Sequence, residues 1–177
     1  MIRYLPTAFA NVEFAWKLLF YGEGGGIDLE KLDIPIVFQD DNGRPFFVPP
    51  AKIFPDPNDL ILALQNNLTI AFGAAAITLH RSIEEAGHRI PRGVFDTEED
   101  QCIALVYMVR NAFAHNIAEP KWEMRNSVFE REYTIQGQTF DLCELNGKHF
   151  RHEDFAVESL FFLRDFSQQH LFNRQPA

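Results

Sequence analysis

The stretch that decides the fold is NDLILALQNNLTIAFGAAAITLHRSIEE, residues 58–85. Asn58 or Asp59 can cap a helix at its start, and Gly87 can close it just after its end. The middle of the stretch is apolar almost all round, which is typical of a helix at the centre of a bundle or of a dimer. Gly73 and the alanines after it leave room for a second helix to approach closely. The stretch therefore predicts a mainly α protein built around one long buried helix.

The same stretch raises the question of a membrane span, because residues 60–79 are strongly apolar. Gln65, Asn66 and Asn67 lie inside this segment, and placing amide side chains in lipid is costly. We therefore expect a buried bundle helix and no membrane segment.

Length and composition favour one soluble domain over residues 1–177, since 46% of the 177 residues are hydrophobic. Phenylalanine is abundant, with 18 copies, so apolar surface remains to be buried against a second copy of the chain. The formal net charge is −9, from 25 acidic and 16 basic side chains. This charge excludes a broad basic face for nucleic acid, so any RNA must be held in a small local basic cleft.

The N-terminus and the cysteines bear on the cellular compartment. The first 21 residues include Glu13 and Lys17 and lack the basic-then-apolar pattern of a signal peptide. Cys102 lies in an apolar helical run and Cys143 in a strand-like run, and neither belongs to a CxxC pair. We expect two reduced, buried thiols in a cytoplasmic protein, without zinc or thioredoxin-like chemistry.

Three further helices are expected where apolar residues recur at helical spacing: over residues 9–21, from the capping box at Asp96 to about His115, and over about 154–172. Asp96 and Glu99 form a capping box before the second of these helices, and Asp154 can cap the third.

Two hairpins are expected as small insertions. Asn42-Gly43 is a tight-turn signal between apolar runs at 34–38 and 46–48, and Gly137 separates strand-like runs at 132–135 and 139–143. The fold class is therefore mainly α, a four- to five-helix bundle with small β-hairpin insertions. Its helical core covers about 59–172, and the N-terminal helix and hairpin, 1–57, form an extension.

The residues best suited to catalysis lie at the C-terminal end of the helix that precedes Pro120. Their sequence is Arg110-Asn111-Ala112-Phe113-Ala114-His115-Asn116. Histidine can move a proton near neutral pH, and arginine can hold a phosphate in a bidentate grip. Together they can perform phosphoryl chemistry without a metal, so we expect neither a metal site nor another cofactor.

The spacing raises a geometric problem. In a regular helix Asn111 and His115 lie on one face, whereas Arg110 and His115 diverge by about 140°. Three arrangements remain open: the last turn loosens near His115, the long Arg110 side chain curls around the helix, or two chains share one cleft.

The string Arg110-Asn111-Ala112-Phe113-Ala114-His115 resembles the Arg-(Asn/His/Asp)-x3-His signature of the HEPN (higher eukaryotes and prokaryotes nucleotide-binding) superfamily. The resemblance implies an up-down bundle of four or five helices, usually dimeric, which matches the pattern over 59–172. Many members are metal-independent endoribonucleases, including toxins of toxin–antitoxin modules and RNA-targeting CRISPR nucleases. The hairpins and residues 1–57 lie outside the common core, so the subfamily is not assigned.

By motif position, the resemblance implies that Arg110 and His115 are catalytic and that Asn111 supports or orients them. In such a site two units face one cleft and cut RNA to a 2′,3′-cyclic phosphate. The partners implied are RNA, a second copy of the chain and an antitoxin protein. Two alternatives stand beside this reading. One is a non-catalytic HEPN-like dimer that binds a nucleotide, RNA or a protein, and the other is a helix end stabilised by these polar residues without any ligand.

Lys121 and Trp122 follow the motif and are candidates for substrate binding, since lysine can grip a phosphate and an indole can stack on a base. The alternative for Trp122 is a place in the core or against a hairpin.

Two histidine-containing groups are weaker candidates. His80, Glu84 and His88 share a helix face at metal-ligand spacing, although the helix is ending at His88. His149 and His152 belong to a polar link before the last helix. A structural role is expected for both groups.

Overall fold

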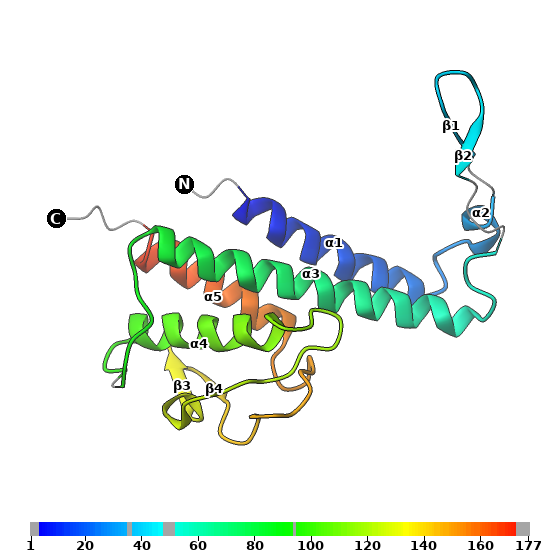
Figure 1. Ribbon diagram of the computed structural model, residues 1–177. Coiled ribbons are helices and arrows are strands. Elements are labelled where there is room, and N and C mark those ends of the chain that lie inside the picture. Colours follow the sequence, from blue (N-terminus) through cyan, green and yellow to red (C-terminus); the bar gives the residue numbers. More distant parts are fainter. Residues whose placement is uncertain (1–3, 35–36, 48–51, 94, 173–177) are drawn as a thin grey trace. The chain divides into compact units, whose positions relative to one another are not determined.

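The structure is a computed structural model that describes residues 4–34, 37–47, 52–93 and 95–172. Its helices and strands are shown in Figure 1. The helices are α1 (Leu5–Glu23), α2 (Leu29–Leu32), α3 (Pro57–Glu85), α4 (Glu98–Phe113), the 3-10 helix η1 (Ser127–Phe129) and α5 (Val157–His170). The strands are β1 (Phe38–Gln39), β2 (Pro45–Phe47), β3 (Glu132–Ile135) and β4 (Gln138–Asp141), paired β1 with β2 and β3 with β4. The expected mainly α class with two small hairpins is confirmed.

The chain forms two compact units, one of Met1–Glu13 with Thr69–Ala177 and the other of Phe14–Leu68. Because α1 and α3 are long, each contributes residues to both units. All of the expected site residues belong to the first unit. The expected single domain, with its core over 59–172, stays a prediction.

The second unit contains the first hairpin, which turns at Asn42-Gly43 as expected. The carboxylate of Asp40 accepts hydrogen bonds from the backbone N–H groups of Asn42 (2.9 Å) and Arg44 (2.8 Å), and Gly43 has φ +74°. A positive φ favours glycine, which explains its place in the turn. Of the expected strand positions, residues 35, 36 and 48 lie outside the described residues.

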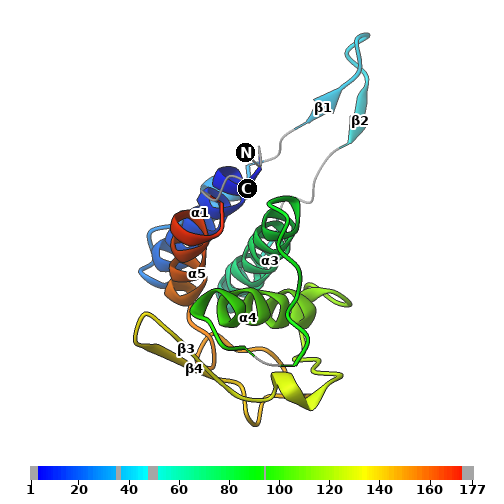
Figure 2. The same ribbon diagram turned by 90° about the vertical axis from the view of Figure 1, so that its left-hand side faces the viewer.

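Helix α4 is central to the first unit because it contacts α5, β3 and η1 (Figure 1). Most of its length is buried, at Cys102, Ile103, Ala104, Leu105, Val106, Met108, Val109, Ala112 and Phe113. Phe9 of α1 packs edge-on against Phe161 of α5, with ring centroids 5.3 Å apart, and Figure 2 shows these two helices side by side. The buried face of α4 therefore fixes where its C-terminal end lies.

The close approach expected at Gly73 is confirmed. Gly73 of α3 lies against the ring of Phe113, the last residue of α4. A Cβ atom built on Gly73 would overlap that ring, with Phe113 Cγ only 2.8 Å away. The absence of a side chain at Gly73 therefore lets the end of α4 pack onto α3.

Replacing Gly73 by alanine should destabilise the protein. Overpacking a core costs about 1–3 kcal/mol, and the overlap with the Phe113 ring places Gly73→Ala in the upper part of this range, at about 2–3 kcal/mol. The gain in helix propensity is about 1 kcal/mol, so we expect a net loss of about 1–2 kcal/mol. Urea denaturation measures this loss. Asn66→Ala, at an exposed position of the same helix, is the matched control and should not destabilise. Equal stability of Gly73→Ala and wild type would contradict the packing argument.

The expected caps of α4 and α5 are wrong in position. Thr97, not Asp96, is the N-cap of α4: its hydroxyl accepts a hydrogen bond from the backbone N–H of Asp100 (3.1 Å) and donates one to the Asp100 carboxylate (2.9 Å). The sequence contains two overlapping capping boxes, and the structure uses the second. Asp154 does not cap α5, because its carboxylate is paired with Arg151 (3.2 Å) and α5 begins later, after Ala156.

Side chains from the first turns of α4 also hold the second hairpin in place. The side chains of Gln101 and Glu98 accept hydrogen bonds from the backbone N–H groups of Thr134 (2.7 Å) and Gln136 (2.9 Å). Gln136 and Gly137 both have positive φ, +47° and +78°, as a two-residue type I′ turn requires. The hairpin is thus tied to the first turns of α4.

The two cysteines differ in environment. Cys102 is buried in α4 as expected, and burial raises the pKa of its thiol to about 12. The expected burial of Cys143 is wrong, since β4 ends at Asp141 and Cys143 lies exposed beyond it. Both thiols are free.

Among the described helices, α3 alone is long and apolar enough to cross a membrane by length and composition, over Asn58–Glu85. The core helix of a soluble protein meets the same criterion, and Phe72, Leu79 and Ile83 are almost completely buried by protein. The expectation of no membrane segment stays a prediction.

Candidate active site at the end of α4

The end of α4 brings the three motif residues to one cavity. The helix ends at Phe113, and Ala114 caps it by donating its backbone N–H to the carbonyl of Asn111 (3.1 Å). His115 lies beyond the cap, so its direction is not set by the helical repeat. Arg110, Asn111 and His115 all line a cavity of about 450 Å³. The structure thus shows a loosened helix end, and sharing of the cleft by two chains stays a prediction.

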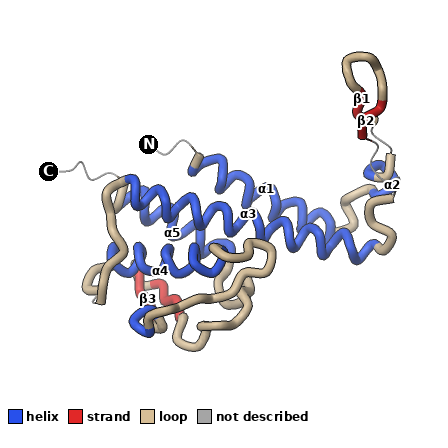
Figure 3. Tube along the Cα trace, viewed as in Figure 1, coloured by secondary structure: helices blue, strands red, loops and turns tan. Residues whose placement is uncertain are grey.

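The chain returns to the helix end as an extended segment, residues 120–125, seen as loop in Figure 3. The backbone N–H of Lys121 donates to the carbonyl of Ala112 (3.0 Å), which satisfies an acceptor left open by the end of the helix. Trp122 exchanges backbone hydrogen bonds with Gly147 and Lys148, at 2.8 and 3.0 Å. These bonds hold the returning segment beside the motif.

Side chains alternate along this segment. Trp122 and Met124 point into the core, whereas Lys121 and Arg125 are exposed and Glu123 is half-buried. Successive side chains of an extended chain point to opposite sides. The alternation therefore places Glu123 and Arg125 on the wall of the cavity.

Glu123 contacts the imidazole of His115, with Oε2 3.3 Å from Nε2. The side chains remain partly open to solvent, 63% exposed for His115 and 42% for Glu123. A carboxylate on one ring nitrogen orients the imidazole and leaves Nδ1 for a second partner. Arg125 lies 3.9 Å from the same Glu123 oxygen. This geometry gives a solvent-accessible, oriented histidine.

Arg110 is oriented by its neighbour. Its Nη1 donates to the side-chain carbonyl oxygen of Asn111 at 3.0 Å. Within the described part of the chain, no carboxylate lies within ion-pair distance of Arg110, so its positive charge is not neutralised by an acid. A guanidinium held in this way can bind a phosphate oxygen.

A buried histidine lies behind the arginine. His80 of α3 packs on the ring of Tyr107, with centroids 5.5 Å apart, and its Nδ1 is 3.5 Å from the Glu84 carboxylate. Burial lowers the pKa of His80, Glu84 opposes this shift, and the charge of Arg110 adds to it. Burial therefore favours the neutral form of the His80 imidazole.

The metal-ligand spacing of His80, Glu84 and His88 does not become a ligand set. His88 turns away, with its Nε2 2.9 Å from the carbonyl oxygen of Leu171. The part of the chain that the structure describes holds no group of three or more His, Cys, Asp or Glu residues placed to bind a metal.

The structure separates Lys121 and Trp122 from the motif cavity. Lys121 is exposed and does not line the cavity, and its backbone forms a bridge with His149. Trp122 is fully buried and packs against Phe150 and Phe155, with ring centroids 5.3 and 6.3 Å away. Its indole offers no open face to a substrate base, in agreement with the alternative that placed it in the core.

Two buried histidines should make the free energy of unfolding depend on pH. Burial is the main cause that lowers the pKa of both His80 and His152 below the ordinary value of 6.5. The unfolded chain therefore binds protons first as the pH falls, and stability is lost below about pH 6.5. We expect the free energy of unfolding, from urea denaturation between pH 8 and 5.5, to be level above pH 7.5 and to fall below 6.5. The double variant His80→Gln/His152→Gln should flatten the curve, whereas the exposed-residue control His149→Gln should not.

The sequence alone did not predict Glu123, Arg125 or Tyr107 as site residues. The signal for the first two was present, since charged side chains alternate with apolar ones from Lys121 to Arg125. Alternation predicts an extended segment with one charged face. That this face lies beside the end of α4 follows only from the tertiary hydrogen bonds of the segment with Ala112 and with residues 147–150.

The cavity thus combines an arginine held by an amide with a histidine held by a carboxylate. This set can bind a phosphate and move a proton.

Comparisons of the chain with protein-family models, with curated proteins and with solved structures find no match.

Proposed function

We propose that the protein is a metal-independent endoribonuclease of the HEPN type. The observation that carries the proposal is that Arg110 and His115 line the same cavity although they are five residues apart. Asn111 and Glu123, which hold these two side chains, supply the orientation that acid–base and electrostatic catalysis need.

The reaction follows from the chemistry of these groups. His115 takes the proton of the ribose 2′-OH while water protonates the departing 5′-oxygen, or it protonates that oxygen while water takes the proton of the 2′-OH. The 2′-oxygen attacks phosphorus, the bond to the 5′-oxygen breaks, and a 2′,3′-cyclic phosphate forms. Arg110 stabilises the negative charge that gathers on the phosphorus oxygens. Because the nucleophile belongs to the substrate, DNA is not cut.

The proposal includes a cytoplasmic homodimer of toxin or defence type, with an antitoxin protein as a further partner. Its support is the apolar surface left over by the fold: Phe14, Phe20 and Leu62 are about 60–72% exposed within the second unit. Burying such side chains against a second copy would stabilise a dimer.

The test is incubation of the purified protein with labelled RNA and with its all-deoxy counterpart, both in EDTA. We expect cutting of RNA to cyclic phosphate ends, detected by mass spectrometry, and intact DNA. Arg110→Ala should lose this activity, whereas Arg81→Ala, which removes an exposed arginine paired with Glu85, should keep it. A folded protein that binds RNA without cutting any of a varied set would overturn the enzyme proposal and favour the non-catalytic binding module.

A further inference from the structure

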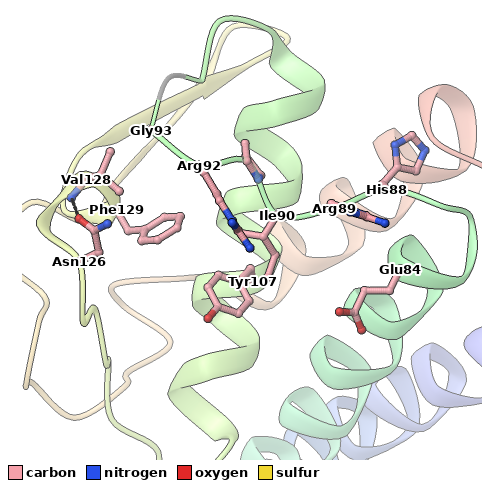
Figure 4. Close-up of a pocket in the computed structure, with 11 residues that line it drawn as sticks. Glu84, His88, Arg89, Ile90, Arg92, Gly93, Tyr107, Asn126, Val128 and Phe129 are labelled. Carbon is pink, nitrogen blue, oxygen red and sulfur yellow. Dashed lines mark hydrogen bonds between the residues drawn. The ribbon is translucent and has the colours of Figure 1, made fainter.

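A second and larger cavity adjoins the motif cavity, and it is shown in Figure 4. Its volume is about 1110 Å³. The two cavities share Tyr107, Asn126 and Phe129 as common wall. The two cavities therefore lie next to each other, on either side of these three residues.

The second cavity is positively charged. Arg89 and Arg92 line it from the loop after α3, and Glu84 is the one carboxylate among the described residues that line it. Both arginines are exposed, and within the described part of the chain no acid pairs with either of them. In Figure 4, Arg92 extends on the side of Tyr107, whereas Arg89 points toward the side of Glu84 and His88.

Together with Arg110 and Arg125 of the motif cavity, these side chains place four arginines around two adjoining cavities. The chain as a whole carries a net charge of −9. Arg125 contacts Glu123 at 3.9 Å, whereas the other three arginines have no acid partner among the described residues. Such a local excess of positive charge in an acidic protein is the small basic cleft that a nucleic-acid ligand would require.

The loop that carries Arg89 and Arg92 is held at several points. Gly87 and Gly93 have positive φ, +93° and +107°, so the chain turns sharply before and after the two arginines. The ring of His88 contacts the carbonyl of Leu171 at 2.9 Å, and Phe95 is buried just beyond. The two guanidinium groups are therefore presented by an anchored loop.

The shared wall offers contacts of a different kind. The rings of Tyr107 and Phe129 lie 5.8 Å apart and inclined at 60°, and both are half-buried. The side-chain carbonyl oxygen of Asn126 accepts a hydrogen bond from the backbone N–H of Val128 (3.1 Å). The NH₂ group of the same side chain remains as a donor toward the cavity (Figure 4). Aromatic edges beside an amide donor suit a ribose and base between two phosphates.

We propose that this cavity binds the nucleotide next to the scissile phosphate, with Arg89 and Arg92 holding the adjacent phosphate of an RNA strand. This inference rests on the proposed function for its position relative to Arg110 and His115. Tyr107 lies three residues before Arg110 on α4, a rise of about 4.5 Å. That distance is of the order of one nucleotide step, which is about 3.4 Å along a stacked strand and longer in an extended one.

The first arm of the test measures binding without cleavage. The probe is a fluorescent octanucleotide of 2′-O-methyl RNA, whose blocked 2′-oxygen cannot attack phosphorus, and the readout is anisotropy of the full-length protein over a range of salt. Arg89→Ala and Arg92→Ala should each weaken binding by about 10-fold and lower the slope of log K against log salt by about 0.7. Arg92→Glu should weaken binding further. The matched control is Arg81→Ala.

The second arm measures cleavage of a ribo-octanucleotide and of a dinucleotide, which has no adjacent phosphate. Arg89→Ala and Arg92→Ala should lower kcat/KM for the octanucleotide by about 10-fold and leave the dinucleotide unchanged. Equal binding and cleavage by Arg92→Ala and Arg81→Ala would overturn the inference while leaving the nuclease proposal intact. Absence of cleavage by wild type, with octanucleotide binding that still depends on Arg89 and Arg92, would overturn the nuclease proposal and retain these arginines as an RNA-binding site.

Discussion

Replacement of His115 by alanine is expected to slow RNA cleavage by about 10²–10⁴-fold, the usual contribution of a general acid or base. His115 is exposed and lies outside α4, so the substitution removes a proton-transfer group without opening the core. The measurement is single-turnover cleavage of labelled RNA in EDTA, with unchanged urea denaturation as evidence of folding. RNA binding should survive, because Arg110 and its Asn111 partner remain in place.

Glu123→Gln tests the orientation of the imidazole. Glutamine keeps an oxygen near Nε2 but removes the negative charge that contacts it at 3.3 Å. A loss on the order of 10-fold in the cleavage rate, smaller than that of His115→Ala, is expected for a positioning residue. Arg131→Ala, which removes an arginine lying over the ring of Phe95, alters charge elsewhere and should leave the rate unchanged.

Undiminished cleavage by His115→Ala would exclude His115 as the proton-transfer group.

Replacement of Trp122 by alanine is expected to lower the free energy of unfolding by about 3–5 kcal/mol. The indole is fully buried and packs against Phe150 and Phe155, so its removal leaves a cavity that the surrounding core cannot fill. Urea denaturation followed by circular dichroism measures the loss, and any fall in RNA binding should follow the fall in folded protein.

Trp122→Phe separates packing from substrate contact. The buried indole Nε1 has no hydrogen-bond partner among the described residues, so phenylalanine loses volume but no hydrogen bond. The expected cost is about 1–2 kcal/mol, and RNA affinity should be unchanged under conditions where the variant is fully folded. Weaker RNA binding by a stable Trp122→Phe protein would restore the indole as a substrate contact.

The helices were predictable because their signals are local and repeated. The apolar surface of α3, the recurring apolar residues of α4 and the turn at Gly137 each depend on a few neighbouring residues. The caps were less predictable, since DTEED offers two capping boxes that differ by one residue. Contacts from Glu98 and Gln101 to the second hairpin accompany the register that the structure adopts, and such distant contacts are not visible in a local pattern.

The candidate site was predictable only in part for the same reason. Arg110, Asn111 and His115 are neighbours in sequence, so their string can be recognised directly. Glu123 reaches His115 through the pairing of residues 120–122 with 147–150. Arg89 and Arg92 join the same region from the loop after α3. Both relationships depend on tertiary structure, and a single sequence does not contain them as a pattern.

The backbone hydrogen bond from Lys121 to Ala112 closes a short loop, residues 114–120, that begins where α4 ends. Inside this loop, the carbonyl oxygen of the Asn116 side chain accepts hydrogen bonds from the backbone N–H groups of Ala118 (3.1 Å) and Glu119 (3.2 Å), so the loop stabilises its own turn. Most of its residues are exposed and add nothing to the core. Because few of its contacts are buried, the length and sequence of this loop should affect the position of His115 more than the free energy of unfolding. In the proposed nuclease, changes in this loop would move His115 relative to the substrate and leave the buried contacts of the fold as they are.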